Sequence, residues 1–218
     1  MKLLILDCDG VFTSGKNYRY VDGPPQYIVG VRISGEKELV VSKNFRDTDW
    51  TACKLFKTKD VHVHVLTGDK WNHQVFADRK IPHTIIDGKL EKENFLDALL
   101  IHYGVTKDEC GYLADDIFDL RLMRKVNEAY CPSDANPFVR EYLDSRYYEE
   151  MTGNTLTLED YKDREVCRLL STNPYVLETK GGDGCVMELY HHLYGKDGLS
   201  DEDIDKLILI NAEGKNEV

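Results

Sequence analysis

The chain has 218 residues, with 28 basic and 39 acidic side chains and a formal net charge of −11. This length fits one domain that carries an elaboration. The acidic balance argues against nucleic-acid binding, which needs a basic surface, and no apolar stretch approaches a membrane span. Asp7 and Asp9 interrupt the apolar N-terminus too early for a signal peptide. The six cysteines are scattered without a Cys-x-x-Cys pair, so we expect reduced thiols and a cytoplasmic location.

Residues 3–6 form an apolar run that is short enough to be a strand buried on both faces. Asp7, Asp9 and Gly10 follow directly after it. Ligands of open α/β sheets bind outside the carboxyl ends of the strands, and two close carboxylates need a counter-charge such as Mg²⁺. A solvated acidic turn is the other interpretation of so short a motif.

The sequence pattern changes at residues 16–43, which contain three short strand-like runs separated by turns at 22–25 and 34–36. This segment interrupts an α/β alternation, which indicates a projecting antiparallel ribbon. Ribbons of two or three strands are marginal alone and often pair with another subunit.

Strands and helices alternate from residue 44 to residue 142, which predicts a parallel sheet with right-handed crossovers. His62 and His64 point to one face of the second strand, where packing against a covering helix is favoured over a metal pair because no third ligand lies nearby. The expected strands are 61–66, 84–86, 110–114 and 128–131, and the expected helices are 49–59, 71–80, 91–103, 120–125 and one from 138.

The last third of the chain departs from this alternation. Residues 143–174 are polar and rich in tyrosine, which indicates a partly helical surface insertion. A last strand at 175–177, a glycine turn at 181–184 and a helix at 185–194 follow, and Ser200 caps a final helix within 198–218, whose last residues we expect to be frayed. We expect a single domain over residues 1–218.

Chemically useful groups follow four strands of the predicted sheet. A carboxylate can act as a nucleophile, a second carboxylate can move the proton, and a hydroxyl, N–H groups and an ammonium can hold phosphoryl oxygens. We expect Asp119 to begin a helix or to contact a metal ligand, rather than to be a ligand itself. The groups at the strand ends are Asp7 with Asp9, Thr67 with Gly68, Lys92, and Asp115 with Asp116.

This set resembles the haloacid-dehalogenase (HAD) superfamily of phosphohydrolases, and within it the 3-deoxy-manno-octulosonate 8-phosphate phosphatase group, which has a minimal cap and includes sialic-acid-type 9-phosphate phosphatases. The resemblance covers roughly residues 2–140 and 175–195. The matching stretches are Asp7-Cys-Asp9-Gly-Val-Phe-Thr-Ser-Gly15, Phe45-x-x-x-Asp49, Leu66-Thr-Gly68, Lys92, Tyr112-Leu-Ala-Asp115-Asp116-x-x-Asp119-x-x-x-Met123, Ser133-Asp-Ala-Asn-Pro137 and Gly181-Gly-x-Gly184.

The resemblance implies a three-layer Rossmann-like core with a central parallel sheet, Mg²⁺ as cofactor, and a homotetramer built through the ribbon. Asp7 would be the nucleophile and a metal ligand, and Asp9 the general acid/base with its backbone carbonyl on the metal. Asp115 would be a direct metal ligand and Asp116 a partner in the metal shell. The phosphate would be held by Thr67, Gly68 and Lys92. Two roles stay open for four further charged residues: contact with the leaving group, or ordinary surface charge. These residues are Lys43, Arg46, Asp49 and Asp69.

Three positions depart from the family pattern: Ser14 stands for an aspartate, Ala114 for a glycine and Met187 for an arginine. The 143–174 insertion is also atypical. The expected activity is therefore phosphomonoester hydrolysis through an aspartyl-phosphate, on a small soluble sugar or sugar-acid phosphate of the 3-deoxy-octulosonate 8-phosphate or nonulosonate 9-phosphate type. A nucleoside monophosphate phosphatase and a catalytically inactive oligomeric scaffold are the alternatives.

Overall fold

The structure of the chain is a computed structural model that describes residues 1–14, 17–20, 30–34, 37–86, 91–195 and 198–213. The predicted turn at 22–25, most of the turn at 34–36, the loop at 87–88 and the tail at 215–218 lie outside the described residues.

A five-stranded, fully parallel sheet forms the centre of the fold, in the order β6-β5-β1-β7-β8. The first strand lies in the middle and every residue of it is buried, as expected for a strand covered on both faces. The strands are β1 (Leu3–Leu6), β5 (His62–Thr67), β6 (His83–Ile85), β7 (Cys110–Leu113) and β8 (Glu128–Tyr130).

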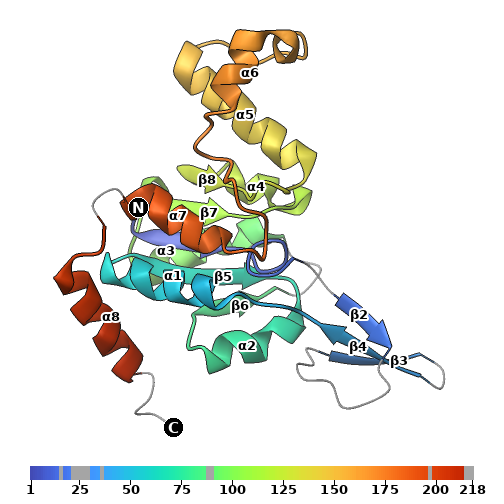
Figure 1. The fold of residues 1–218 in the computed structure, drawn as a ribbon, viewed down its shortest axis with the longest axis vertical. Helices are drawn as coiled ribbons and strands as arrows, with labels where there is room; N and C mark the ends of the chain where they lie inside the picture. The colour runs from blue at the N-terminus through green and yellow to red at the C-terminus, as the bar shows by residue number, and fades with distance from the viewer. Residues whose placement is uncertain (15–16, 21–29, 35–36, 87–90, 196–197, 214–218) are drawn as a thin grey trace.

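Helices cover both faces of this sheet, so the predicted three-layer α/β architecture is confirmed (Figure 1). Leu4 and Leu6 face one core with α1, α2 and α7, whereas Leu3 and Ile5 face the other with α3, α4 and α5. The helices are α1 (Asp47–Thr58), α2 (His73–Asp78), α3 (Leu96–Tyr103), α4 (Leu120–Met123), α5 (Pro137–Thr152), α6 (Arg164–Leu170), α7 (Cys185–Tyr194) and α8 (Asp201–Glu213). None of the helices described is both long and apolar enough to cross a membrane.

The predicted ribbon is a separate three-stranded antiparallel sheet that projects from the core (Figure 1). Its order is β2-β4-β3, with β4 in the centre. The strands are β2 (Asn17–Tyr20), β3 (Gly30–Ser34) and β4 (Lys37–Ser42).

Several predicted helices begin with a 3₁₀ turn and are shorter than expected. The helix predicted at 91–103 is η2 (Lys92–Phe95) followed by α3, and Gly104 ends it with a left-handed conformation, as expected. The other 3₁₀ turns are η1 (Lys70–Asn72), η3 (Lys107–Glu109), η4 (Ile117–Asp119) and η5 (Asp160–Lys162).

The strand predicted at 175–177 is wrong. Only Val176 forms a bridge, a parallel one with Cys131. Directly after it, the carboxylate of Glu188 accepts the backbone N–H groups of Glu178 and Thr179, both at 2.7 Å. These bonds take the N–H groups of Glu178 and Thr179 away from the ladder, while the carbonyl of Thr179 still accepts the N–H of Ser133 at 3.0 Å.

The segment 143–174 is mostly helical, but its predicted start falls inside α5. The side chain of Leu143 is fully buried in the core, because α5 continues the α/β alternation without a break. Beyond it, α5 extends away from the sheet to Thr152 and α6 packs beside it (Figure 1). The helical, surface-lying character of the segment is thus confined to the residues after 143.

The two histidines of β5 pack against a helix, as the alternation predicted. His64 bonds the Tyr103 hydroxyl at 2.9 Å through Nδ1 and the Thr84 hydroxyl at 2.9 Å through Nε2. The ring of His62 lies 4.9 Å from that of Tyr103. Burial lowers the pKa of His64 to about 4, so it stays neutral.

The side chain of Asp49, in α1, caps the start of α7 and contacts Met187, which lies 138 residues later in the chain. Its Oδ1 accepts the backbone N–H groups of Val186 at 3.0 Å and Met187 at 3.1 Å. These N–H groups have no partner within their own helix, so the carboxylate satisfies them and favourably meets the positive end of the helix dipole. Burial raises the pKa of Asp49 to about 6, although the two backbone hydrogen bonds by themselves lower it.

Asp49→Ala is therefore expected to lower the free energy of unfolding by about 2 kcal/mol, at the upper end of helix-cap losses. Asp47→Ala is the matched control, because its carboxylate lies in the same helix and is 91% exposed. Urea unfolding at neutral pH measures both. Equal unfolding midpoints for the two variants would contradict the capping role.

Candidate active site

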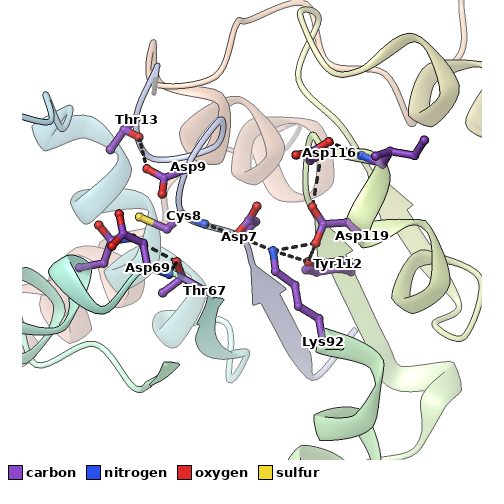
Figure 2. A network of polar contacts seen from close by, with 12 residues as sticks. Asp7, Cys8, Asp9, Thr13, Thr67, Asp69, Lys92, Tyr112, Asp116 and Asp119 are labelled. Atoms are coloured by element: carbon purple, nitrogen blue, oxygen red, sulfur yellow. Dashed lines mark hydrogen bonds and ion pairs between the residues drawn. The ribbon is translucent and has the colours of Figure 1, made fainter. Parts of the chain in front are cut away.

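The groups predicted at strand ends meet at one edge of the sheet. Leu6 pairs with Val65 of β5 on one side and with Leu113 of β7 on the other, so these three strands end level with one another. The N–H of Asp7 donates to the carbonyl of Leu113 at 2.9 Å, and that of Ile86 to the carbonyl of Thr67 at 2.8 Å. Figure 2 shows the resulting cluster around Asp7.

Lys92 joins two carboxylates across this edge. Its Nζ lies 2.7 Å from Oδ1 of Asp7 and 2.7 Å from Oδ1 of Asp119, and the Tyr112 hydroxyl donates to the same Asp119 oxygen at 2.6 Å (Figure 2). Burial lowers the pKa of Lys92, but the two carboxylates outweigh burial and the net pKa is raised. A cation at the start of a helix opposes the helix dipole, and these carboxylates explain why it is stable here.

Asp7, Asp115 and Asp119 each bring a carboxylate oxygen within 4.8 Å of the others. Oδ1 of Asp115 is buried without a hydrogen-bond partner among the described residues. Burial raises the pKa of Asp7 to about 7 and of Asp115 to about 8, and neighbouring carboxylates add to both rises. Three crowded oxygen donors with an unsatisfied atom fit a hard divalent cation.

Asp116 lies at the same turn, but its carboxylate faces its own backbone. Oδ1 accepts the N–H of Ile117 at 2.6 Å, which caps η4, and the Asp119 carboxylate accepts the N–H of Asp116 at 3.4 Å. The structure thus places the Asp119 carboxylate, rather than that of Asp116, beside Asp7 and Asp115. The signal for Asp119 in the sequence is its position three residues after a capping aspartate.

Asp9 lies in a different environment from Asp7. Both of its carboxylate oxygens contact the Nζ of Lys43, at 2.6 and 2.8 Å, and the Thr13 hydroxyl donates to Oδ1 at 3.1 Å. The two carboxylates therefore have separate cationic partners, Lys92 for Asp7 and Lys43 for Asp9.

Thr67 and Gly68 end β5 on the other side of Asp7. The Thr67 hydroxyl accepts the N–H of Asp69 at 3.2 Å and the side-chain amide of Asn72 at 3.1 Å. Asn72 is fully buried, and it was not expected from the sequence, because its contact depends on how η1 folds back on the strand.

Two adjoining pockets open around these residues. A cleft of about 860 Å³ contains Asp7, Asp9, Thr67, Gly68 and Lys92, and a smaller pocket of about 380 Å³ contains Asp7, Asp9, Asp115 and Ser14. Residues at the cleft that were not expected from the sequence are Ile86, Glu91, Glu93, Ile117, Phe118 and Arg121.

Two glycines make the smaller pocket possible. Gly10 has a φ of +81°, and a Cβ there would collide with the Asp115 carboxylate. A Cβ on Gly181 would collide with the carbonyl oxygen of Gly10. The glycine turn before α7 therefore packs directly on the loop that carries Asp7 and Asp9, which explains why both stretches are rich in glycine.

The four residues considered for leaving-group contact separate into two pairs. Asp69 lines the cleft and Lys43 lies buried beside it. Asp49 is a buried helix cap, neither a cleft residue nor a surface charge, and Arg46 pairs with Asp183 at 2.9 Å on the exposed surface. Of the departures from the family pattern, Met187 packs against the core and Ala114 is buried in it, whereas Ser14 lines the smaller pocket.

The raised pKa values predict how the metal-free protein responds to pH. Asp7 and Asp115 bind protons more tightly when folded than when unfolded, so between about pH 4 and pH 8 the folded state holds more protons and its stability falls as pH rises. We expect the free energy of unfolding, measured with urea in a chelator, to fall by several kcal/mol from pH 5 to pH 8. Asp115→Asn, which removes one of the two groups, should flatten this slope, and an unchanged slope would contradict the assignment.

The sheet has the order β6-β5-β1-β7-β8, with carboxylates after β1 and β7 and a threonine and a lysine beside them, which is the arrangement expected for a hydrolase of the HAD type. No protein-family model matches the chain. Over 174 residues the chain is 29% identical to the 3-deoxy-D-manno-octulosonate 8-phosphate phosphatase KdsC of Escherichia coli strain K12, covering 78% of this chain and 79% of that protein.

Solved structures show the same fold. A HAD superfamily (subfamily III A) hydrolase from Legionella pneumophila has a TM-score of 0.63 and 20% identity, covering 96% of this chain and 90% of the other. The 3-deoxy-D-manno-octulosonate 8-phosphate phosphatase of Moraxella catarrhalis, in complex with a magnesium ion, a phosphate ion and KDO, has a TM-score of 0.58 and 18% identity, covering 98% and 92%. In sequence and fold the chain is thus similar to phosphatases of the HAD type, and this similarity favours an enzyme over the alternative of an inactive scaffold.

Proposed function

We propose that the chain is a Mg²⁺-dependent phosphomonoesterase that works through an aspartyl-phosphate on Asp7. The observation that supports this most is the meeting of Asp7, Asp115 and Asp119 with Lys92 at the carboxyl edge of the sheet. Phosphoryl transfer needs a nucleophile, a counter-charge and donors for three phosphoryl oxygens in one place. These residues supply the nucleophile, the metal ligands and one cationic donor, and Thr67 and Gly68 line the same cleft as further donors.

The carboxylates of Asp7, Asp115 and Asp119 would hold the cation, together with the backbone carbonyl of Asp9, and Asp116 would lie close by. When bound, Mg²⁺ supplies positive charge that lets Asp7 stay ionised and offsets the charge of the phosphoryl group. The magnesium and phosphate ions in the complex of the Moraxella enzyme support this choice of metal.

The steps follow from the two environments of the aspartates. A carboxylate oxygen of Asp7 attacks phosphorus in line, the bond to the leaving oxygen breaks, and Asp9 gives that oxygen a proton. Asp9 then accepts a proton from water as the water oxygen attacks phosphorus, which releases phosphate and restores Asp7. Thr67, Gly68 and Lys92 hold the phosphoryl oxygens throughout.

The substrate that we propose is a sugar or sugar-acid phosphate, of the 3-deoxy-octulosonate 8-phosphate or nonulosonate 9-phosphate type. The similarity to KdsC supports this class. The cleft of about 860 Å³ includes the phosphate site and also carries Glu91, Glu93 and Arg121, whose charged groups can bond hydroxyl groups.

Nucleoside monophosphates remain the second candidate because of Phe118. Its side chain is 79% exposed and lies at the cleft. An exposed aromatic ring near a phosphate site is suited to stacking with a nucleobase.

A panel of sugar phosphates, sugar-acid phosphates and nucleoside monophosphates, assayed for phosphate release with and without EDTA, tests the proposal. We expect release only with Mg²⁺ and preferentially from the sugar-acid phosphates. A preference for nucleotides that is lost in Phe118→Ala would favour the second candidate, and release that persists in EDTA would contradict the metal requirement.

We also propose that the chain is cytoplasmic and assembles as a homotetramer through the ribbon of β2, β3 and β4. The projection of this small sheet from the core supports the assembly (Figure 1), since a sheet of so few strands gains stability by packing one face against another element. Light scattering should give the mass of a tetramer, and the mass of a monomer would contradict it.

A further inference from the structure

Lys43 is the most deeply buried ammonium group near the two aspartates among the residues that the structure describes. Its side chain is fully buried, and Nζ contacts Asp9, Oδ2 of Asp69 at 2.8 Å and Oδ1 of Asn72 at 2.8 Å. An ammonium has three N–H donors, so these three partners use all of them. Lys43 is buried and does not line the cleft, whereas Lys92 does, so we assign Lys43 to these protein partners rather than to direct contact with a leaving group.

Asn72 extends this contact to the phosphate side of the cleft. Its Oδ1 accepts from Lys43 and its Nδ2 donates to the Thr67 hydroxyl at 3.1 Å. The same hydroxyl oxygen accepts the N–H of Asp69 at 3.2 Å. With two donors on one hydroxyl oxygen, both acceptor positions of Thr67 are filled and its proton is left for an acceptor elsewhere.

The two residues thus form one buried chain of contacts, Asp9 to Lys43 to Asn72 to Thr67. At one end is the carboxylate that would move the proton, and at the other the hydroxyl that would hold the phosphoryl group. Lys43 and Asn72 come from separate segments, directly after β4 and at the end of η1. Buried polar contacts of this kind fix orientation, because every member is satisfied in one arrangement only.

We propose that Lys43 and Asn72 are positioning residues, which hold Asp9 in line with the leaving oxygen and aim the Thr67 hydroxyl at the phosphoryl group. This rests on the proposed function. Lys43 acts through Asp9, so its loss affects proton transfer to the leaving group. Asn72 acts through Thr67, so its loss affects phosphate binding whatever the leaving group is.

Two substrates of similar shape separate these effects. Phenyl phosphate needs a proton on its leaving oxygen, whereas 2,4-dinitrophenyl phosphate releases a stable anion and does not. In single-turnover experiments with Mg²⁺, Lys43→Met should slow release of phenol about 100-fold, the scale of general-acid catalysis, and release of dinitrophenol less than about threefold. Asn72→Leu should slow both alike and weaken inhibition by inorganic phosphate about tenfold, the loss expected for one hydrogen bond.

Lys59→Met is the matched control, because Lys59 also pairs with a carboxylate, Asp203 at 2.7 Å, on α8 rather than at the cleft. It should leave both rates unchanged. Equal slowing of the two substrates by Lys43→Met, or no slowing of either, overturns the positioning role of Lys43. If Lys43→Met does not fold, an Asn72→Leu variant with unaltered phosphate inhibition overturns the proposal. A wild-type chain that hydrolyses neither these esters nor any member of the phosphate panel with Mg²⁺ would instead overturn the proposed function itself.

Discussion

Asp7→Asn is expected to lower phosphatase activity by about four orders of magnitude or more, because the amide cannot attack phosphorus and form the acyl phosphate. The fold should be retained. Burial raises the pKa of Asp7 to about 7, so the folded state disfavours the ionised carboxylate, and a neutral side chain of the same shape removes this cost. Lys92 keeps the carboxylate of Asp119 as a partner at 2.7 Å.

Phosphate release and thermal unfolding together measure this outcome. Asp97→Asn serves as the control for the same chemical change, since its side chain is 81% exposed, and it should keep full activity. Retention of more than a few per cent of activity by Asp7→Asn would mean that another group attacks the phosphorus.

Removal of the metal site is the second change with a large expected effect. Asp115→Asn should weaken Mg²⁺ binding about 100-fold or more and reduce activity at limiting metal accordingly, because this carboxylate faces Asp7 and Asp119 and has an unpartnered oxygen. Calorimetric titration with Mg²⁺ measures the affinity, and activity against Mg²⁺ concentration gives a second readout.

Asp116→Asn is the matched comparison at the neighbouring position. Its carboxylate caps the N–H of Ile117 at 2.6 Å, so its effect on Mg²⁺ affinity should be about tenfold, the lower end of the range for residues that orient ligands. The reverse order, with Asp116→Asn more damaging to Mg²⁺ binding, would show that Asp116 turns toward the cation.

The strand ends could be predicted from the sequence because parallel strands place their carboxyl ends at one edge. Apolar runs that end in Asp7, Thr67 and Asp115 are local signals, and the topology brings them together. The preference of His62 and His64 for packing followed in the same way from alternation and from the lack of a third ligand.

Contacts between distant segments could not be predicted in this way. Asp49 caps a helix 138 residues away, and nothing near it in the sequence indicates that helix. The turn of Asp119 toward Lys92, and of Asp116 toward its own backbone, depends on side-chain torsions at one 3₁₀ turn. The buried position of Lys43 depends on η1 folding back onto β5, and a contact of this kind produces no periodic pattern in the sequence.

Trapping of the covalent intermediate tests the central claim most directly. The chain is mixed with substrate and Mg²⁺, quenched, treated with borohydride, which reduces an acyl phosphate to an alcohol, and digested for peptide mass spectrometry. The account predicts reduction at Asp7 alone, dependent on both substrate and Mg²⁺, and absent in Asp7→Asn. Reduction at another carboxylate, or an unmodified Asp7 in a chain that is turning over substrate, would contradict it.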